Sequence, residues 1–369
     1  MASWTDAEFD LDFALRSGHE LPAGVQVEFM ADPDSIEVGT AESDFDFLDG
    51  RWVDVRATPD ISRLFPETVI SIENAEINSR GAVRLADGTR ISSMLFNTRP
   101  GDWDVVDRSL VSSIPGKRSS VVQGASGFGH WLIQRVGRLM TAHDFAPTTR
   151  LISAALPHSG DDFYRRSGYD PEKVRRLGRQ FRKSWIVDRV YLPSYAGVNG
   201  GRVADARRFK RDMARLLADV DLTSGMPAYP ERVFLGRRSE SSTREGIRNG
   251  LEVEQVFLDH GYEFIDPASL PFDEQVRLIR SAKVIAGEGG SFAQNAMYGA
   301  PGLTVVVVNA NNGPNKSPYT PGRKTYGRMA TDALGLHYRR INASEHARHP
   351  GWIADPDIVR RALASMPIP

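Results

Sequence analysis

The sequence predicts a mixed α/β protein with two halves. Beyond residue 230, short apolar runs alternate with amphipathic runs, which indicates right-handed βαβ units around a parallel sheet. In the first half, Leu132, Val136 and Leu139 share one face at helical spacing, which predicts a helix packed on a core. Residues 223–230 contain glycine and proline and are expected to separate the halves.

The composition is that of an ordinary globular chain and excludes several kinds of function. The 369 residues are enough for two domains, and 41% of them are hydrophobic and 25% charged. A net charge of −1 gives no global attraction to nucleic acid, so no nucleic-acid partner is expected. The absence of cysteine excludes disulfides, thiolate zinc sites and cysteine nucleophiles, and it fits a reducing compartment.

The sequence contains neither a signal-peptide pattern nor an apolar run long enough to span a membrane. Residues 1–6 lack the basic region and apolar core of a signal peptide. No apolar run approaches the roughly 18 residues that a spanning helix needs. We therefore expect a cytoplasmic protein.

Charge is distributed unevenly along the chain. Residues 1–50 are strongly acidic, and residues 173–215 are strongly basic. Such blocks are usually solvated faces. Alternatively, the two blocks pair with each other, or the basic block contacts an acidic substrate or lipid headgroups. The lipid alternative predicts peripheral association of residues 173–215 with the inner face of a membrane.

Local patterns predict the elements of the first half in order. Residues 1–50 show little periodicity and are expected to be partly flexible, whereas residues 51–122 resemble short strands joined by turns, a small β-meander. Asp170-Pro171 carries the signal of a helix start. The remaining predictions are a helix that begins near residue 130, strands at 150–156 and 185–192, and a helix around 209–217.

The second half alternates more regularly. Strands are predicted at 233–235, 263–265, 284–286 and 303–308, and helices at about 244–260, 272–282, 291–298 and 355–364. A cleft between two α/β halves is the default place for a small-molecule site.

The glycine-rich turn after the strand at 284–286 is the first candidate site. In an open α/β sheet, ligands bind at the carboxyl ends of the strands. Here Gly287, Gly289 and Gly290 allow close approach of the backbone, and Ser291 and Phe292 open a helix whose N–H groups can face phosphates. Glu288 is predicted to accept a hydrogen bond from a ribose or sugar hydroxyl. The alternative is a plain tight turn in which Glu288 is a solvated charge at a helix N-terminus. Neither a Walker loop nor a GxGxxG pattern fits.

Arginines and a histidine form the other candidates. Arg237 and Arg238 follow the strand at 233–235, so a parallel sheet places them at the same edge as Glu288, and Arg248 adds positive charge there. The alternative is a surface pair. His130 lies at a glycine-flanked helix start and is suited to general-base work. The alternative is a capping or core histidine.

No metal site is predicted. Five Asp-x-Asp pairs could in principle supply oxygen ligands, but none clearly follows an apolar strand of the α/β section. The pairs are Asp10/Asp12, Asp32/Asp34, Asp44/Asp46, Asp102/Asp104 and Asp355/Asp357.

Several short motifs follow one another along the chain. Two lie upstream, Glu73-Asn74-Ala75 and Gly129-His130-Trp131-Leu132. The downstream motifs are Arg237, Arg248-Asn249, 261–265, 272–275, 282–287, Gly290-Ser291, Asn295, 326–330 and 335–338. Taken in order, these motifs resemble glycosyltransferase family 61, which includes bacterial capsular polysaccharide biosynthesis proteins. The two upstream motifs are similar to the "NA" strand and the His-Trp signature of that family.

The resemblance implies a GT-B-like pair of Rossmann-type domains that face a cleft, with a small β-rich N-terminal segment. The implied divisions are residues 1–122 and 123–225 on the acceptor side, 226–345 as the nucleotide-sugar domain, and 346–369 as a C-terminal helix. It also implies an inverting hexosyl- or pentosyltransferase that needs no cofactor and no essential metal, with a nucleotide sugar and an oligo- or polysaccharide acceptor as partners. His130 is then the first choice for the base and Glu288 the second. Arg237, Arg238, Arg248, Gly289, Gly290, Ser291, Phe292 and Asn295 would bind the donor.

One departure from the family pattern matters. Many members read Gly-x-His-Gly-Ala-Gly at the central turn, whereas this chain has Glu288 in place of the histidine. Two alternative functions therefore stay open: a pyruvyl- or phosphoryl-type transferase on a similar scaffold, and a carbohydrate- or nucleotide-binding module without turnover.

Overall fold

The computed structural model describes residues 7–48, 50–55, 65–78, 81–93, 96, 103, 111–122, 128–154, 160–177, 183–194, 205–222, 229–236, 247–288, 291–309, 326–343 and 353–367. The chain forms two compact units. Unit 1 comprises residues 1–37, 62–201 and 207–216, and unit 2 comprises residues 38–61, 202–206 and 217–369. The mixed α/β class is as predicted.

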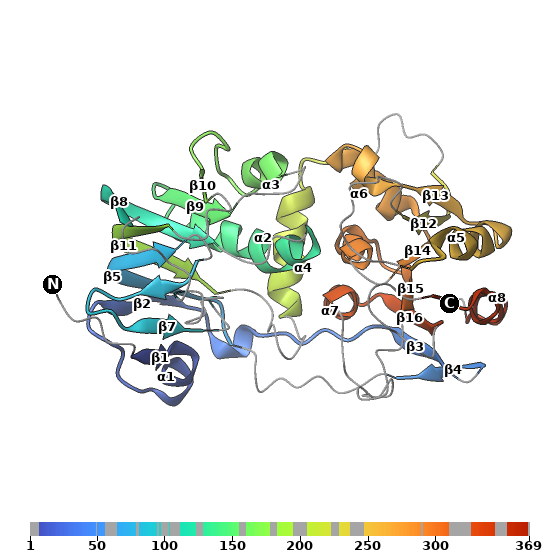
Figure 1. Ribbon diagram of the computed structural model, residues 1–369, viewed down its shortest axis with the longest axis horizontal. Coiled ribbons are helices and arrows are strands. Elements are labelled where there is room, and N and C mark those ends of the chain that lie inside the picture. The colour runs from blue at the N-terminus through green and yellow to red at the C-terminus, as the bar shows by residue number, and fades with distance from the viewer. Residues whose placement is uncertain are drawn as a thin grey trace. The chain divides into compact units, whose positions relative to one another are not determined.

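Unit 2 is built on a seven-stranded sheet in the order β13-β12-β14-β15-β16-β3-β4 (Figure 1). All neighbours from β13 to β3 are parallel, and β4 alone joins antiparallel. The strands are β13 (Glu263–Ile265), β12 (Arg232–Leu235), β14 (Val284–Glu288), β15 (Thr304–Asn309), β16 (His337–Asn342), β3 (Ser43–Leu48) and β4 (Arg51–Asp54).

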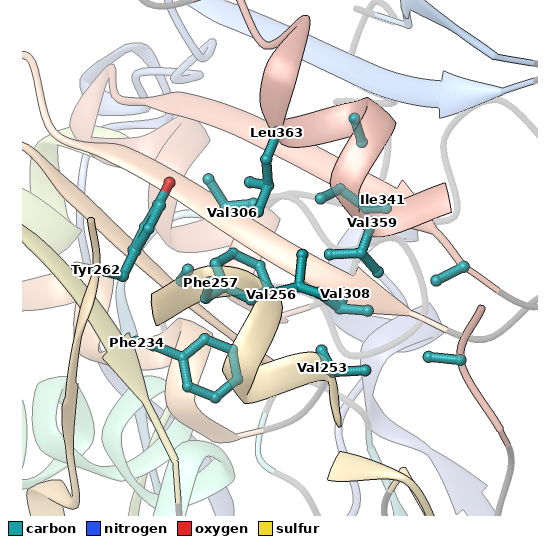
Figure 2. Close-up of a cluster of buried hydrophobic side chains, with 14 of the residues drawn as sticks. Phe234, Val253, Val256, Phe257, Tyr262, Val306, Val308, Ile341, Val359 and Leu363 are labelled. Carbon is teal, nitrogen blue, oxygen red and sulfur yellow. The ribbon is translucent and has the colours of Figure 1, made fainter. Parts of the chain in front are cut away.

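Helices cover both faces of this sheet, as a parallel sheet requires. Helices α5 (Gly250–Asp259) and α8 (Pro356–Ala364) pack on one face. Figure 2 shows the resulting core, in which Val256 and Phe257 of α5 and Val359 of α8 lie against Val306 and Val308. On the other face are α6 (Phe272–Ser281), the 3-10 helix η6 (Ser291–Tyr298) and α7 (Tyr326–Leu334) (Figure 1). A further 3-10 turn, η5 (Pro267–Ser269), follows β13.

The N-terminal part of the chain differs from its prediction. Residues expected to be partly flexible form β1 (Glu8–Asp10), α1 (Leu11–Ser17), β2 (Val25–Met30), the 3-10 turn η1 (Pro33–Ser35) and β3. Strand β3 leaves unit 1 and extends the sheet of unit 2, so the predicted division at 1–122 runs across both units. Local periodicity could not show this, because β3 is held by long-range contacts: Arg340 pairs with buried Asp46, and Arg339 donates to Ser43 Oγ at 2.7 Å.

Unit 1 has a mixed sheet in the order β1-β7-β6-β5-β11-β8-β9-β10, with β2 paired to β5. The predicted meander holds only for β5, β6 and β7, which are antiparallel, whereas β8 runs parallel to β11. Glycines with positive φ, Gly81 and Gly88, close the two turns. The strands are β5 (Thr68–Asn78), β6 (Val83–Arg84), β7 (Arg90–Ser92), β8 (Val111–Val122), β9 (Arg150–Ala154), β10 (Arg175–Leu177) and β11 (Ser184–Pro193).

The helices of unit 1 are α2 (Phe128–Phe145), α3 (Gly160–Arg166) and α4 (Ala206–Leu217). The apolar stripe predicted for α2 is buried. The helix predicted after Asp170 is wrong. The Asp170 carboxylate accepts a hydrogen bond from Glu172 N in a turn. The chain then forms β10, Arg175–Leu177, which pairs with β9. Pairing with the edge of β9 outweighs the weak local preference for a helix.

None of the helices in the described ranges combines the length and the apolar character needed to cross a bilayer.

Candidate functional site

The turn after β14 lies at the carboxyl edge of the parallel sheet in unit 2. Gly287 is the last β14 residue whose side chain would face η6, and a Cβ there would lie 2.7 Å from Leu235 O and 2.9 Å from the Phe292 ring. Only glycine fits that space. Strand β12 ends in the same layer, since Leu235 is in register with Gly287. Gly289 and Gly290 lie outside the described residues.

Glu288 faces the opposite side of the sheet from Gly287, toward α5. Its Oε1 accepts a hydrogen bond from Ile247 N, just before α5 begins. The carboxylate therefore helps to fix the entry to α5. Neither interpretation of the sequence included this contact, and a role of Glu288 in binding or catalysis stays a prediction.

The segment after the turn is a 3-10 helix rather than an α-helix. Ser291 begins it, and Phe292 is half-buried against Gly287. Asn295 is buried, and its Oδ1 has no hydrogen-bond partner in the described part of the chain. Gln294 was not predicted as a site residue, and its Oε1 likewise has no hydrogen-bond partner among the described residues. Asn295 is itself one of the predicted donor-binding residues, and Gln294 is its neighbour in η6.

The structure describes only one of the three predicted arginines, Arg248. Arg237 and Arg238 lie outside the described residues, and Arg248 is exposed just before α5. Neighbouring Asn249 is structural, because its Nδ2 donates to Ala354 O at 2.8 Å and its Oδ1 accepts from Ala354 N at 3.0 Å. It thereby ties α5 to the segment that leads into α8.

His130 occupies the third position of α2 in unit 1, and its side chain lies outside the described part. The helix that carries it is firmly anchored. Arg138, which is buried, donates from Nε to Pro193 O at 2.8 Å and from Nη2 to Phe96 O at 2.7 Å. The backbone position of His130 is thus coupled to the end of β11.

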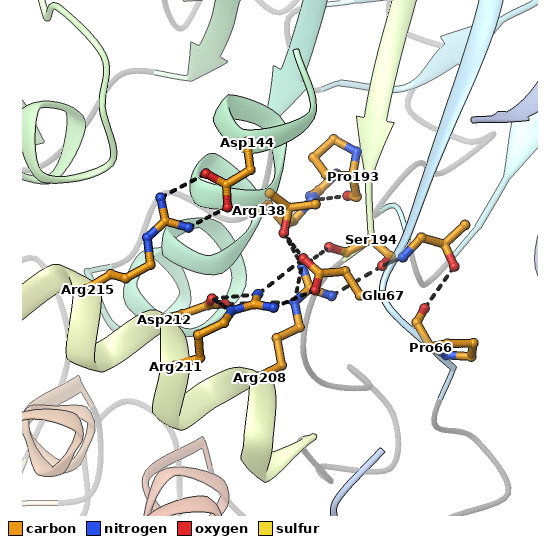
Figure 3. A network of polar contacts seen from close by, with 12 residues as sticks. Pro66, Glu67, Arg138, Asp144, Pro193, Ser194, Arg208, Arg211, Asp212 and Arg215 are labelled. Carbon is orange, nitrogen blue, oxygen red and sulfur yellow. Dashed lines mark hydrogen bonds and ion pairs between the residues drawn. The ribbon is translucent and has the colours of Figure 1, made fainter. Parts of the chain in front are cut away.

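A second anchor of α2 is the polar network of Figure 3, which joins α2 and α4 to the start of β5. Arg211 bridges Glu67 and Asp212 at 2.9 and 2.8 Å. Burial acts to raise the pKa of Glu67, but the charge of Arg208 and hydrogen bonds from Arg211 and Thr141 outweigh it, and the pKa falls to about 2. At Asp212, burial outweighs the same arginines and raises the pKa to about 6.

A buried asparagine at the end of β16 was not predicted. Asn342 is in register with Asn309, the last residue of β15, and its Nδ2 has no partner among the described residues. Its position at the end of a strand could have identified Asn342 as a candidate, since a polar residue that ends a parallel strand lies at the ligand-binding edge.

The Asp-x-Asp pairs have other partners wherever the structure describes them. Asp10, Asp32 and Asp355 cap helix N-termini, and Asp46 pairs with Arg340. Asp102 and Asp104 lie outside the described ranges. No group of three or more potential metal-ligating side chains gathers among the residues described.

The acidic and basic blocks are partly paired. Lys210 of the basic block contacts Glu37 of the acidic block at 2.8 Å, as one sequence alternative predicted. Arg211 and Arg215 pair with Glu67 and Asp144. These contacts leave less positive charge for lipid headgroups, and peripheral membrane association stays a prediction.

The fold and the site define a two-unit α/β protein with a glycine-dependent turn at the ligand-binding edge of a parallel sheet. The model of the family described as glycosyltransferase 61 matches residues 128–307. The family predicted from the motifs is therefore the one whose model matches, and the match runs from α2 to β15.

Comparison with curated proteins gave no match. Among solved structures, the chain is similar to the bacterial iron-containing dodecameric glycosyltransferase TibC from enterotoxigenic E. coli H10407. The two are 14% identical over 91% of this chain and 94% of that chain, with a TM-score of 0.29. A likeness at that score carries no argument about the site.

Proposed function

We propose that this protein transfers a sugar, with inversion, from a nucleotide-sugar donor to a glycan hydroxyl during assembly of a capsular or other surface polysaccharide. The supporting observation is the β14–η6 turn. It lies at the carboxyl edge of a parallel sheet and within the matched family region, and close packing of Leu235 and Phe292 demands glycine at position 287.

The donor would bind at this turn in unit 2. Transfer from a UDP- or GDP-sugar leaves a nucleoside diphosphate, and transfer from a CMP-sugar leaves a nucleoside monophosphate. In either case negative charge grows on the leaving group in the transition state. Arg237, Arg238 and Arg248, together with the N–H groups around residues 289–292, would stabilise that charge. We therefore expect no essential metal.

The acceptor hydroxyl must lose a proton as it attacks the anomeric carbon. We assign this role to His130. Since Glu288 accepts from Ile247 N, we expect it to hold the entry to α5 and to affect the reaction through the shape of the turn.

The test combines donor binding with product formation. A thermal-shift screen of UDP-, GDP- and CMP-sugars identifies the donor, because ligand binding raises the unfolding temperature by mass action. His130→Ala should lower kcat by about 10²–10⁴-fold while the thermal shift with donor is unchanged. His19→Ala, at an exposed position in unit 1, is the control. If His130→Ala retains full activity, the base is another group. If no donor stabilises the wild-type protein, the proposed function is wrong.

A further inference from the structure

Strand β2 lies at an open edge of the sheet in unit 1. Figure 1 shows it beside β5, which is its sole pairing partner among the described residues. An antiparallel strand with one neighbour uses only about half of its backbone N–H and C=O groups in the ladder, and the others point outward. Such an edge can accept a further strand, so soluble proteins normally protect it with charge, with proline or by covering it.

The side chains of β2 give the edge little of that protection. The segment Val25–Met30 contains no lysine, arginine or proline. Val27, Phe29 and Met30 are 40%, 42% and 40% exposed. A bulge lies between Val27 and Phe29, which oppose successive residues of β5 and therefore lie on opposite faces of the sheet. Exposed apolar side chains thus flank the edge on both faces.

The one charged side chain of β2 is engaged within unit 1. Glu28 Oε1 accepts a hydrogen bond from Ser71 Oγ of β5, and it lies 3.9 Å from Arg189 Nη1 of β11. Strand β11 lies on the far side of β5, so the Glu28 carboxylate is turned back over the sheet and away from the open edge. An incoming strand would therefore meet outward backbone groups between valine, phenylalanine and methionine side chains.

The charges that follow β2 select the direction in which two copies of this edge could pair. Asp32 and Asp34 come directly after the strand and are exposed. Parallel pairing of two β2 strands would bring these carboxylates together at one end, at about the 5 Å spacing of neighbouring strands. Antiparallel pairing would put them at opposite ends of the six-residue strand, at least about 20 Å apart. A twofold arrangement therefore avoids like-charge repulsion.

A second copy of the chain matches this edge in every respect. It offers the same outward backbone groups and the same uncharged, apolar side chains, and a twofold pair buries both edges at once and leaves neither open. We propose that β2 is a self-association surface, at which two copies of this chain pair antiparallel and join their unit 1 sheets into one continuous sheet.

Sedimentation and light scattering on the full chain test the association. Wild type should form a dimer, with twice the chain mass of 40.8 kDa. Phe29→Lys places a charge in the interface twice, once in each copy, so it should raise the dimer dissociation constant at least about a hundredfold. Leu251→Lys is the matched control. Leu251 is 77% exposed on α5 of unit 2, so this variant should remain a dimer.

Cross-linking tests the antiparallel direction without a charge in the interface. The chain contains no cysteine, so a single introduced cysteine reports on one position. Antiparallel pairing brings position 27, near the middle of β2, close to the same position in the second copy, and keeps the two copies of position 34 far apart. A short bismaleimide should therefore convert Val27→Cys to a covalent dimer and leave Asp34→Cys as single chains. Val27 and Asp34 are both exposed.

Three results would overturn the proposal. Wild type that stays monomeric at every concentration tested would show that no second copy occupies β2. A dimer that withstands Phe29→Lys as well as Leu251→Lys would use another surface. Cross-linking of Asp34→Cys as efficient as that of Val27→Cys would contradict antiparallel pairing. Circular dichroism shows whether Phe29→Lys is folded, and if it is not, the cross-linking contrast decides.

Discussion

The two units attach their helices to their sheets by different kinds of contact. The sheet of unit 2 is parallel except for β4 and lies between two helical layers, with an almost wholly apolar core on its α5–α8 side. In unit 1, by contrast, α2 and α4 are fastened to the start of β5 by buried charged groups that include Glu67, Arg208 and Asp212. Apolar packing tolerates changes in pH, whereas a buried charge network responds to them.

The two units also hold their helices by different contacts. Buried polar atoms without a hydrogen-bond partner among the described residues occur in both units, such as Asn342 Nδ2 in unit 2 and Ser167 Oγ in unit 1. In unit 1, the charges of Figure 3 pair with one another and hold the helix that carries His130. Buried charge thus positions that helix, whereas apolar contacts position α5 and α8 in unit 2.

The largest effect is expected where a buried charge pair interrupts the apolar pattern of unit 2. Arg340→Met leaves Asp46 buried without its guanidinium, which should lower the free energy of unfolding by about 3–5 kcal/mol. Urea unfolding followed by circular dichroism measures it. Arg360→Met, which breaks an exposed pair with Asp357, should change stability by less than about 0.5 kcal/mol. Equal losses would mean that β3 does not depend on the Asp46 pair.

A middle-sized effect is expected at the contact between α2 and α4. A methyl group at Gly137 would overlap Asp212 Oδ2, so Gly137→Ala should destabilise the protein by about 1–3 kcal/mol even though alanine favours helices. Asp212→Ala in the same chain should recover part of the loss, because it vacates the space. Gly250→Ala is the control. Gly250 is half-buried but has open space around its Cβ, so this substitution should be neutral or stabilising. Absence of rescue would argue against direct overlap.

The smallest effect is a pH dependence of stability confined to unit 1. The pKa of Asp212 is raised to about 6, so the folded state binds the extra proton between about pH 4 and pH 6. Stability from this group is therefore greatest at and below about pH 4 and is lost as the pH rises to 6, by on the order of 1–2 kcal/mol. Asp212→Asn should remove that loss.

Glu67 acts in the opposite direction and at lower pH. Its pKa is lowered to about 2, so the stability it contributes is present above about pH 4.5 and is lost as the pH falls toward 2. Unfolding temperatures of wild type and Asp212→Asn between about pH 2 and pH 7 test the contrast. Parallel curves above about pH 4 would show that Asp212 does not titrate in that range.

Prediction from sequence succeeded where the physical signal is local. The strands β12, β13, β14 and β15 lie within one or two residues of their predicted bounds, because runs of apolar residues and intervening helical periodicity are features of neighbouring residues. The glycine turn was predicted for the same reason. Its geometry at position 287 then supplied the cause, a close approach of Leu235 and Phe292.

Other features depended on distant partners. Residues 43–48 look unremarkable until Arg339 and Arg340, almost three hundred residues later, supply their partners. Arg175–Leu177 became a strand because β9 offered an edge. No local pattern indicated the contact between Glu288 and Ile247 N, because the two residues are 41 positions apart.

The amino-acid sequence alone determined the α/β class, the order of elements beyond residue 230, the match to the family and the position of the glycine turn. Those properties rest on short local patterns or, for the family, on the order in which such patterns follow one another. Only the tertiary structure decided that β3 completes the sheet of unit 2, that Glu288 fastens the entry to α5, and that Asn342 carries a buried donor without a partner among the described residues. Strand pairing and desolvation act between residues that are remote in sequence, and no local pattern records them.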